Sequence, residues 1–254
     1  MNKIRVVNNK IIPFVDSDVS INDNNITFLN NGNYYIEYID SDNLDITYNL
    51  SDNVCICLFE VSTGNNISTN IKYNLNKNSS LILSKFYSNI NTDEKVSINL
   101  MKENASIKYN FSSISNNDDK YLFNIYHLDS ETCSDVYNRT IARKDSSNFF
   151  DINSFVDNGI KDCFLNQNTK IVTLGDSNNR INPNMFIGEE STTAVHSSVI
   201  GCVSDDDLFY LMSRGIDYNT AINLIIKGMV LSNINPDMEI KEKILNILDK
   251  IGGE

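Results

Sequence analysis

Proline and histidine are scarce in this sequence, and long apolar runs are absent. The 254 residues include 3 proline and 2 histidine residues. No apolar run approaches the ~18 residues of a membrane-spanning helix, so no transmembrane segment is predicted. The short apolar stretch near the start is interrupted by Asn8, Asn9 and Lys10, which does not fit a signal peptide. We therefore expect a cytoplasmic protein.

Several motifs that carry chemistry are also missing from the sequence. There is no glycine-rich phosphate loop, no H-E-x-x-H zinc motif and no convincing Ser/His/Asp order. A nucleotide is therefore not expected on this chain and would have to bind to a partner. Catalysis by this chain alone is not expected, and we classify it as a non-enzyme.

The cysteine pattern fits neither a disulfide framework nor a zinc ribbon. The count is odd, at 5, with one C-x-C pair (Cys55 and Cys57) and three scattered singles, Cys133, Cys163 and Cys202. We expect reduced and mostly buried thiols.

Positive charge is in deficit. The net charge is −12 and the isoelectric point is about 4.6. Such a field repels phosphate backbones and anionic lipid surfaces, so neither nucleic acid nor membrane is an expected partner.

Asparagine, in contrast, is abundant, with about 40 residues. It tolerates left-handed backbone and suits the corners between short strands. From about residue 26 to residue 200, short segments alternate apolar and polar residues, as at Ile46, Tyr48 and Leu50, which predicts half-buried strands. Sandwich, barrel and β-solenoid are all compatible with this pattern. The number of strands and the lack of hairpin dipeptides favour a solenoid.

The composition changes near residue 204, where helical signals begin. Ser204 is a candidate N-cap, the aspartates at 205–207 complement the helix dipole, and Gly215 is a C-terminal stop after Arg214. A second helix is predicted after Asp217, and a third after Asn235-Pro236. The apolar face of the second helix is expected at Ala221, Leu224, Ile225, Gly228 and Met229. The predicted domains are a β-domain, 1–203, and a helical domain, 204–254.

Residues 165–232 resemble the SufB/SufD family, the scaffold subunits of the SUF iron–sulfur cluster assembly system. The resemblance rests on Pro183 at an expected strand boundary, His196, Gly201, and the run "LFYLMSRGI" at 208–216. Family members share this order and spacing, although Met229 replaces the family's Phe. The N-terminal 130 residues resemble the family only in being rich in strands.

The resemblance implies a mainly β fold, a right-handed parallel β-helix followed by a small helical domain. It also implies binding of the SufC ATPase through the C-terminal helices. It further implies pairing, through the β-helix, with a SufB-like subunit or a second copy of this chain. A transiently held iron–sulfur cluster would assemble at that interface. The residues expected to contact the ATPase are Leu208, Phe209, Tyr210, Arg214, Gly215 and Ile225.

His196 is the leading candidate for a cluster ligand, because it matches the family's histidine and imidazole binds iron. The alternative is a packing or capping histidine at a strand-to-helix corner. Members of the SufB type carry a Cys and a Glu where this chain has Ser177 and Ser197, so it resembles SufD more closely. Cys202 and Cys163 are secondary candidates for ligands. His127 is expected to be a surface histidine or one with its hydrogen bonds satisfied.

Two other classes remain open from the sequence. One is a β-solenoid binding or adhesion module with no role in cluster assembly. The other is a β-helix carbohydrate enzyme, which would need clustered carboxylates in a cleft.

Overall fold

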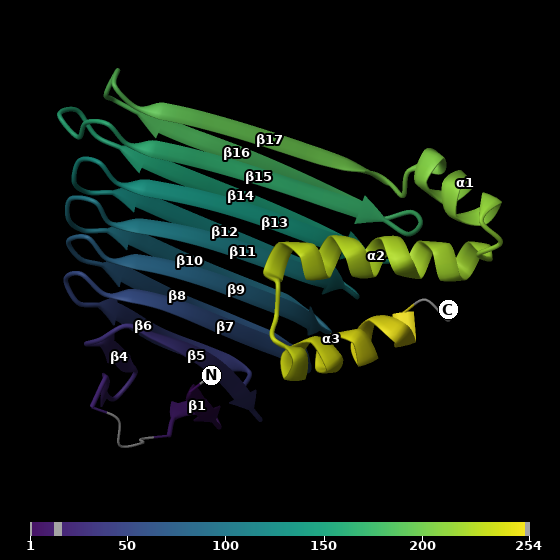
Figure 1. The fold of residues 1–254 in the computed structure, drawn as a ribbon, viewed down its shortest axis with the longest axis horizontal. Helices are drawn as coiled ribbons and strands as arrows, with labels where there is room; N and C mark the ends of the chain where they lie inside the picture. The colour runs from purple at the N-terminus through teal and green to yellow at the C-terminus, as the bar shows by residue number, and fades with distance from the viewer. Residues whose placement is uncertain (1, 13–16, 252–254) are drawn as a thin grey trace.

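Two parallel β-sheets and three C-terminal helices make up the protein (Figure 1). The computed structural model describes residues 2–12 and 17–251. Sheet A contains β1 (Asn2–Val7), β2 (Lys10–Ile11), β5 (Gly32–Ile39), β7 (Cys55–Gly64), β9 (Ser80–Asn89), β11 (Ser106–Ser115), β13 (Cys133–Ala142), β15 (Phe164–Thr173) and β17 (Thr193–Cys202). Sheet B contains β3 (Val19–Asn22), β4 (Asn25–Phe28), β6 (Asn43–Leu50), β8 (Ile67–Leu75), β10 (Thr92–Leu100), β12 (Asp118–His127), β14 (Ser147–Val156) and β16 (Asn178–Ile187). The helices are α1 (Asp205–Ser213), α2 (Tyr218–Ile234) and α3 (Met238–Ile251).

From β4 onward, each strand pairs in parallel with the strand two positions further along the chain. Ile71 in β8, for example, lies between Ile46 in β6 and Val96 in β10, and all three side chains are buried. The chain therefore alternates between the two sheets and winds into a coil. This confirms the predicted β-solenoid and its period-2 pattern, while the right-handed sense of the coil stays a prediction.

The N-terminal end of the solenoid is closed by short antiparallel strands. β2 folds back on β1, and β3 folds back on β4, so these two short strands form the sheet edges. Short edge strands offer few free backbone groups to another chain.

The interior of the coil is packed by columns of apolar and aromatic side chains. Tyr48 and Tyr73, in neighbouring strands, stack with ring centroids 5.1 Å apart. A buried ionic cluster interrupts this packing, because Lys85 Nζ lies 2.8 Å from Glu94 Oε1 and 3.2 Å from Glu60 Oε2. Tyr73 also donates to Glu60 at 2.8 Å, whereas Glu94 Oε2 has no hydrogen-bond partner in the described part of the chain, and burial raises the pKa of Glu94.

Asparagines with left-handed backbone lie at the corners where sheet B strands turn into sheet A strands. Asn53, Asn78 and Asn104 have φ values of 62°, 54° and 59°. Asn78 Nδ2 donates to Asn53 Oδ1 at 2.9 Å, and Asn104 Nδ2 donates to Asn78 Oδ1 at 3.3 Å. The predicted role of asparagine as a corner residue is confirmed, and the corners also form a hydrogen-bonded ladder.

The helices share a core with the outer face of sheet A. The buried side chains of α2 are Ala221, Ile226, Val230 and Ile234, and Asn233 Nδ2 donates to the Phe111 carbonyl at 2.8 Å. The predicted apolar face of α2 is therefore rotated from the observed one. Leu224 is exposed and Ile225 is only half-buried. No helix in the described part of the chain is long and apolar enough to cross a membrane.

The helix boundaries agree with the caps read from the sequence. Ser204 Oγ accepts from Asp207 N, Asp217 accepts from Thr220 N, and Gly215 has a φ of 86°. Arg214 is the C-cap residue of α1, and its guanidinium lies 5.4 Å from the centroid of the Tyr210 ring. Pro183, which the sequence placed at a strand boundary, lies inside β16. This strand forms the edge of sheet B, where a missing N–H is tolerated.

The ladder of corner asparagines yields a stability prediction at Glu131, which has a φ of 58° at the equivalent corner position beside Asn104. Left-handed backbone costs a glutamate more than an asparagine. Glu131→Asn should raise the free energy of unfolding by about 0.5–1 kcal/mol, measured by urea denaturation. Glu131→Gln removes the same charge without relieving the backbone, so it is the matched control. Equal stability of the two variants would contradict the prediction.

Candidate functional site

The C-terminal end of the solenoid is open, unlike its N-terminal end. β17 is the edge of sheet A, and its side chains from Thr193 to Ile200 are all exposed. Several of them are large and apolar. Val195 is 50% exposed and Ile200 46%, and Phe186 on neighbouring β16 is 55% exposed. An edge strand with unpaired backbone and exposed apolar side chains is a template for another protein surface.

His196 lies in the middle of β17, so the alternative of a histidine at a strand-to-helix corner is wrong. It pairs in register with Gln167 of β15, which pairs in turn with Val136 of β13. Gln167 and Val136 both face the buried interior. His196 is therefore the last member of an interior column, exposed because no further coil covers it.

The side chain that precedes His196 in this column, on the neighbouring strand β15, is polar and buried. Gln167 Nε2 donates to Ser154 Oγ at 2.8 Å and to the Asn184 carbonyl at 3.2 Å. Its Oε1 atom is buried and has no hydrogen-bond partner in the described part of the chain. The open end thus combines an exposed imidazole with a buried acceptor that has no partner, and Ile200 lies on the same face of β17 as His196, whereas Val195 lies on the opposite face.

The other tentative cluster ligands do not lie near His196. Cys202 is six residues further along the same strand, which corresponds to about 20 Å. Cys163 immediately precedes β15, level with Thr192, and is about 13 Å from His196 along the strand direction. The described residues contain no group of three His, Cys, Asp or Glu side chains placed to hold a metal ion.

The two serines that depart from the SufB pattern are also separated. Ser197 follows His196 on β17, so its side chain points to the opposite face of the sheet. Ser177 lies in the corner after β15, beyond the level of Cys202, and its Oγ accepts from Asn179 Nδ2 at 2.7 Å. In the described part of the chain, His196 and Cys202 are both exposed on β17 but lie about 20 Å apart, too far to share one metal ion.

Cys163 belongs to a buried polar cluster inside the solenoid. Its Sγ lies 3.3 Å from Thr132 Oγ1, which lies 2.8 Å from His127 Nδ1. His127 Nε2 lies 2.8 Å from Ser134 Oγ, so both ring nitrogens have partners. The expectation that His127 is satisfied is confirmed, and Cys163 is not accessible from solvent.

The expectation of mostly buried thiols is wrong. All five cysteines are free, but only Cys163 is buried, and Cys55 and Cys202 are exposed. Cys55 and Cys57 share the outer face of β7, as their spacing predicts, and the raised pKa of Cys57 reflects partial burial and the neighbouring Cys55 thiol.

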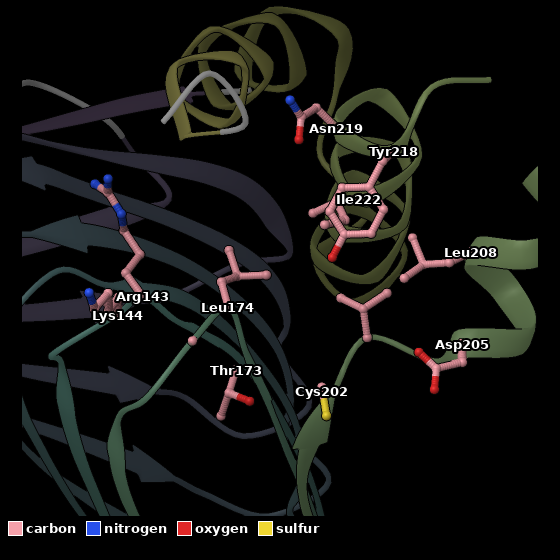
Figure 2. Close-up of a pocket in the computed structure, with 12 residues that line it drawn as sticks. Arg143, Lys144, Thr173, Leu174, Cys202, Asp205, Leu208, Tyr218, Asn219 and Ile222 are labelled. Carbon is pink, nitrogen blue, oxygen red and sulfur yellow. The ribbon is translucent and has the colours of Figure 1, made fainter. Parts of the chain in front are cut away.

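α1 presents an exposed aromatic surface near the open end. Phe209 is 76% exposed, and Tyr210, held by Arg214, is 57% exposed. Leu208 is the buried residue of this helix, and its side chain lines one side of a pocket (Figure 2). Of the residues expected to contact a partner, Phe209, Tyr210 and Arg214 are accessible, while Leu208 and Ile225 have mainly packing roles.

Residues that were not identified from the sequence extend the exposed surface of β17 and the aromatic surface of α1. Val195, Val199 and Ile200 belong to β17, whose apolar residues were not recognised as part of a strand. Tyr218 and Leu224 add exposed apolar area on α2. The alternation in "TAVHSSVI" was the available signal for β17, and the rotation of α2 depends on packing against sheet A.

Comparison with known proteins gives one family and one curated relative. The family model described as "SUF system FeS cluster assembly, SufBD core domain" matches residues 60–229. The match therefore includes β17, α1 and most of α2. The iron-sulfur cluster assembly protein SufD of Bacillus subtilis (strain 168) is 24% identical over 129 residues, which are 50% of this chain. The matched region covers 30% of that relative's length.

Two buried titratable groups of the interior respond to pH in opposite directions. Burial lowers the pKa of His127 from 6.5 to about 4 and raises the pKa of Asp119 from 3.8 to about 6. The stabilisation from neutral His127 is complete above pH 6.5 and is lost as the pH falls to 4. The stabilisation from protonated Asp119 is complete below pH 3.8 and is lost as the pH rises through 6.

Removing one group should therefore expose the contribution of the other. As the pH drops from 6.5 to 4, the free energy of unfolding of Asp119→Asn should fall by about 3 kcal/mol more than that of the wild type. Over the same pH range, the free energy of unfolding of His127→Gln should rise relative to that of the wild type by a similar amount. Urea titrations followed by circular dichroism between pH 4 and 7 measure both slopes. Profiles parallel to wild type in both variants would show that neither pKa is shifted by folding.

Proposed function

The chain belongs to the SufBD core family of the SUF iron–sulfur cluster assembly system, and we propose that it is a non-enzymatic scaffold subunit of such a complex. In this proposal it pairs through the open end of its solenoid and docks an ABC-type ATPase of the SufC kind through α1. The observation that carries the proposal is the exposed edge strand β17, on which the family's histidine position lies.

Pairing is supported by the asymmetry of the two solenoid ends. The N-terminal end has short antiparallel edges, while β16 and β17 each have 10 residues, and β17 is exposed along nearly its whole length and β16 at both ends. A long, apolar, open edge in a soluble protein is a liability unless another chain covers it. The partner in this proposal is a second solenoid end, from a SufB-like subunit or from a copy of this chain.

The role proposed for His196 follows from its isolation. One imidazole cannot hold an iron–sulfur cluster, and Cys202 and Cys163 lie too far along the strands to join it. Further ligands would have to come from the facing chain. Because Ser177 and Ser197 are poor iron ligands, we propose that the partner supplies thiolate or carboxylate while this chain supplies imidazole. The cluster is then cargo held between two chains.

Docking of the ATPase is proposed for the exposed face of α1. Phe209 and Tyr210 are large aromatic residues, a type enriched where binding energy concentrates. Two residues separate β17 from α1, so a force applied to the helix would reach the strand that carries His196. This short connection supports the idea that the ATPase cycle acts on the cluster interface.

The pairing proposal is tested by placing a charge on the open end. Ile200→Lys should abolish the paired species, measured by sedimentation velocity on the chain alone and with its SufB-like subunit. Ile82→Lys is the matched control, because Ile82 is similarly exposed (44%, against 46% for Ile200) but lies on β9, several coils away. The same sedimentation behaviour in both variants would refute pairing through this end.

The paired species also tests the ligand role of His196. After anaerobic reconstitution with iron and sulfide, His196→Ala should remain paired but lose most of the visible absorbance of the cluster. Ser197→Ala, on the opposite face of the same strand, should keep it. Equal cluster retention in the two variants would remove His196 as a ligand.

The docking proposal is tested at Phe209. Phe209→Glu should weaken binding of a SufC-type ATPase by at least about 30-fold, or roughly 2 kcal/mol, measured by calorimetry. Leu128→Glu provides the control, since Leu128 is exposed (46%) at a solenoid corner remote from α1. Unchanged affinity in Phe209→Glu would place the ATPase elsewhere.

A further inference from the structure

Two free thiols share the outer face of β7, away from the open end of the solenoid and from α1. Cys55 and Cys57 are two residues apart in this strand, so their side chains point to the same side of sheet A. Cys55 is exposed and Cys57 is half-buried. The two thiols are close enough to interact, because Cys55 contributes, after partial burial, to the raised pKa of Cys57. The proposed pairing and ATPase docking use neither residue, so the inference below is independent of them.

The spacing of the two thiols suits a bridging ion better than a disulfide. Two residues along a strand correspond to about 6.6 Å between the Cα atoms, near the upper limit of about 6.8 Å for a disulfide. A disulfide draws its two sulfurs to about 2 Å, whereas an ion with thiolate bonds of about 2.3 Å holds them up to about 4.6 Å apart. Each Cβ–Sγ bond needs only a small lean along the strand to reach that separation.

The number of available ligands decides which ion fits this pair. Structural zinc takes four protein ligands, and iron–sulfur clusters are commonly held by four cysteines. In the part of the chain that the structure describes, no group of three His, Cys, Asp or Glu side chains is placed to hold a metal ion, so Cys55 and Cys57 have no third ligand of these types. Soft thiolates select Cu(I), an ion that is stable with two ligands in a line.

The surroundings of Cys57 also favour a soft ion over a hard one. A cavity of about 500 Å³ lies beside this residue, between sheet A and the end of α2, and Phe59 and Ile82 supply apolar surface to it. Ile82 is the neighbour of Cys57 on β9. Apolar side chains exclude the water that a hard cation keeps in its shell, while a two-coordinate soft ion needs none. The cavity leaves room beside Cys57 for a thiol carrier from which such an ion is transferred.

We propose that Cys55 and Cys57 together bind one Cu(I) ion on the outer face of β7. Two S–H bonds break and two S–Cu bonds form, both protons pass to solvent, and neither copper nor sulfur changes its oxidation state. The bound group carries a net charge of −1. Because two protons are displaced, the affinity rises by up to about 100-fold for each pH unit below the ordinary pKa of a thiol, about 8.5.

Cys133 provides a matched control within the same sheet. It lies in register with Cys55 through Ser80 and Ser106, on the same outer face. The residue two positions after it is Asp135 instead of a second cysteine. A single thiol in an equivalent place can therefore be compared directly with the pair.

The test is a competition for Cu(I) against bicinchoninate, on the reduced full chain without oxygen, iron or sulfide. The wild type should hold one ion per chain, and the ion should slow the alkylation of Cys55 and Cys57 by iodoacetamide, but not that of Cys133, in peptide mass spectrometry. Cys57→Ser should weaken binding by at least about 100-fold, because loss of a ligand exceeds the effect of about 10–100-fold that follows a change in an outer-shell partner. Cys133→Ser should bind Cu(I) as the wild type does.

The pH dependence of the affinity gives a second readout. From pH 7 to pH 6, after correction for protonation of bicinchoninate, the affinity of the wild type should fall about 100-fold and that of Cys57→Ser at most about 10-fold, because one proton fewer is displaced. Absence of binding, one ion shared by two chains, equal affinity of Cys57→Ser and Cys133→Ser, or the wild-type pH dependence in Cys57→Ser would each overturn the proposal.

Discussion

In a parallel solenoid, each coil takes its backbone hydrogen bonds and its interior contacts from the coils on either side. The N-terminal coil meets this requirement within the chain, because β2 and β3 fold back as short antiparallel edges. At the other end, β16 and β17 have neighbours on one side only. Gln167 is buried by the coil above it, while His196 in the same column has no such cover. The exposure of the histidine is thus a direct consequence of where the coil stops.

The helices add a second asymmetry to the molecule. α2 and α3 bury their apolar stripes on the outer face of sheet A and leave the outer face of sheet B uncovered (Figure 1). α1 packs mainly on α2 and has one buried side chain, Leu208. Because α1 follows β17 after two residues, the most loosely packed helix is joined directly to the open strand. The ATPase surface and the pairing surface proposed here are therefore mechanically connected through a short segment of backbone.

Local patterns predicted much of this architecture. Alternation identified most strands, asparagine marked the corners, and Ser204, Asp217 and Gly215 marked helix ends, because these signals depend on neighbouring residues. The same reasoning failed where the neighbours are distant in the sequence. The buried face of α2 is selected by contact with sheet A, so Leu224 is exposed and Ile226 is buried, although both are apolar. The exposure of the cysteines depends on the covering coil or helix in the same way.

By itself, the sequence determined a strand-rich coil, three capped helices and membership of a family recognised by the residues from Pro183 to Ile216. The tertiary structure decided that His196 is exposed on an open strand, and that Cys202, Cys163 and Ser177 lie too far along the strands to join it. The physical reason is the extended backbone. At about 3.3 Å per residue, side chains a few positions apart in a strand are already beyond the reach of a common ligand, and only the stacking of coils shows which positions become neighbours.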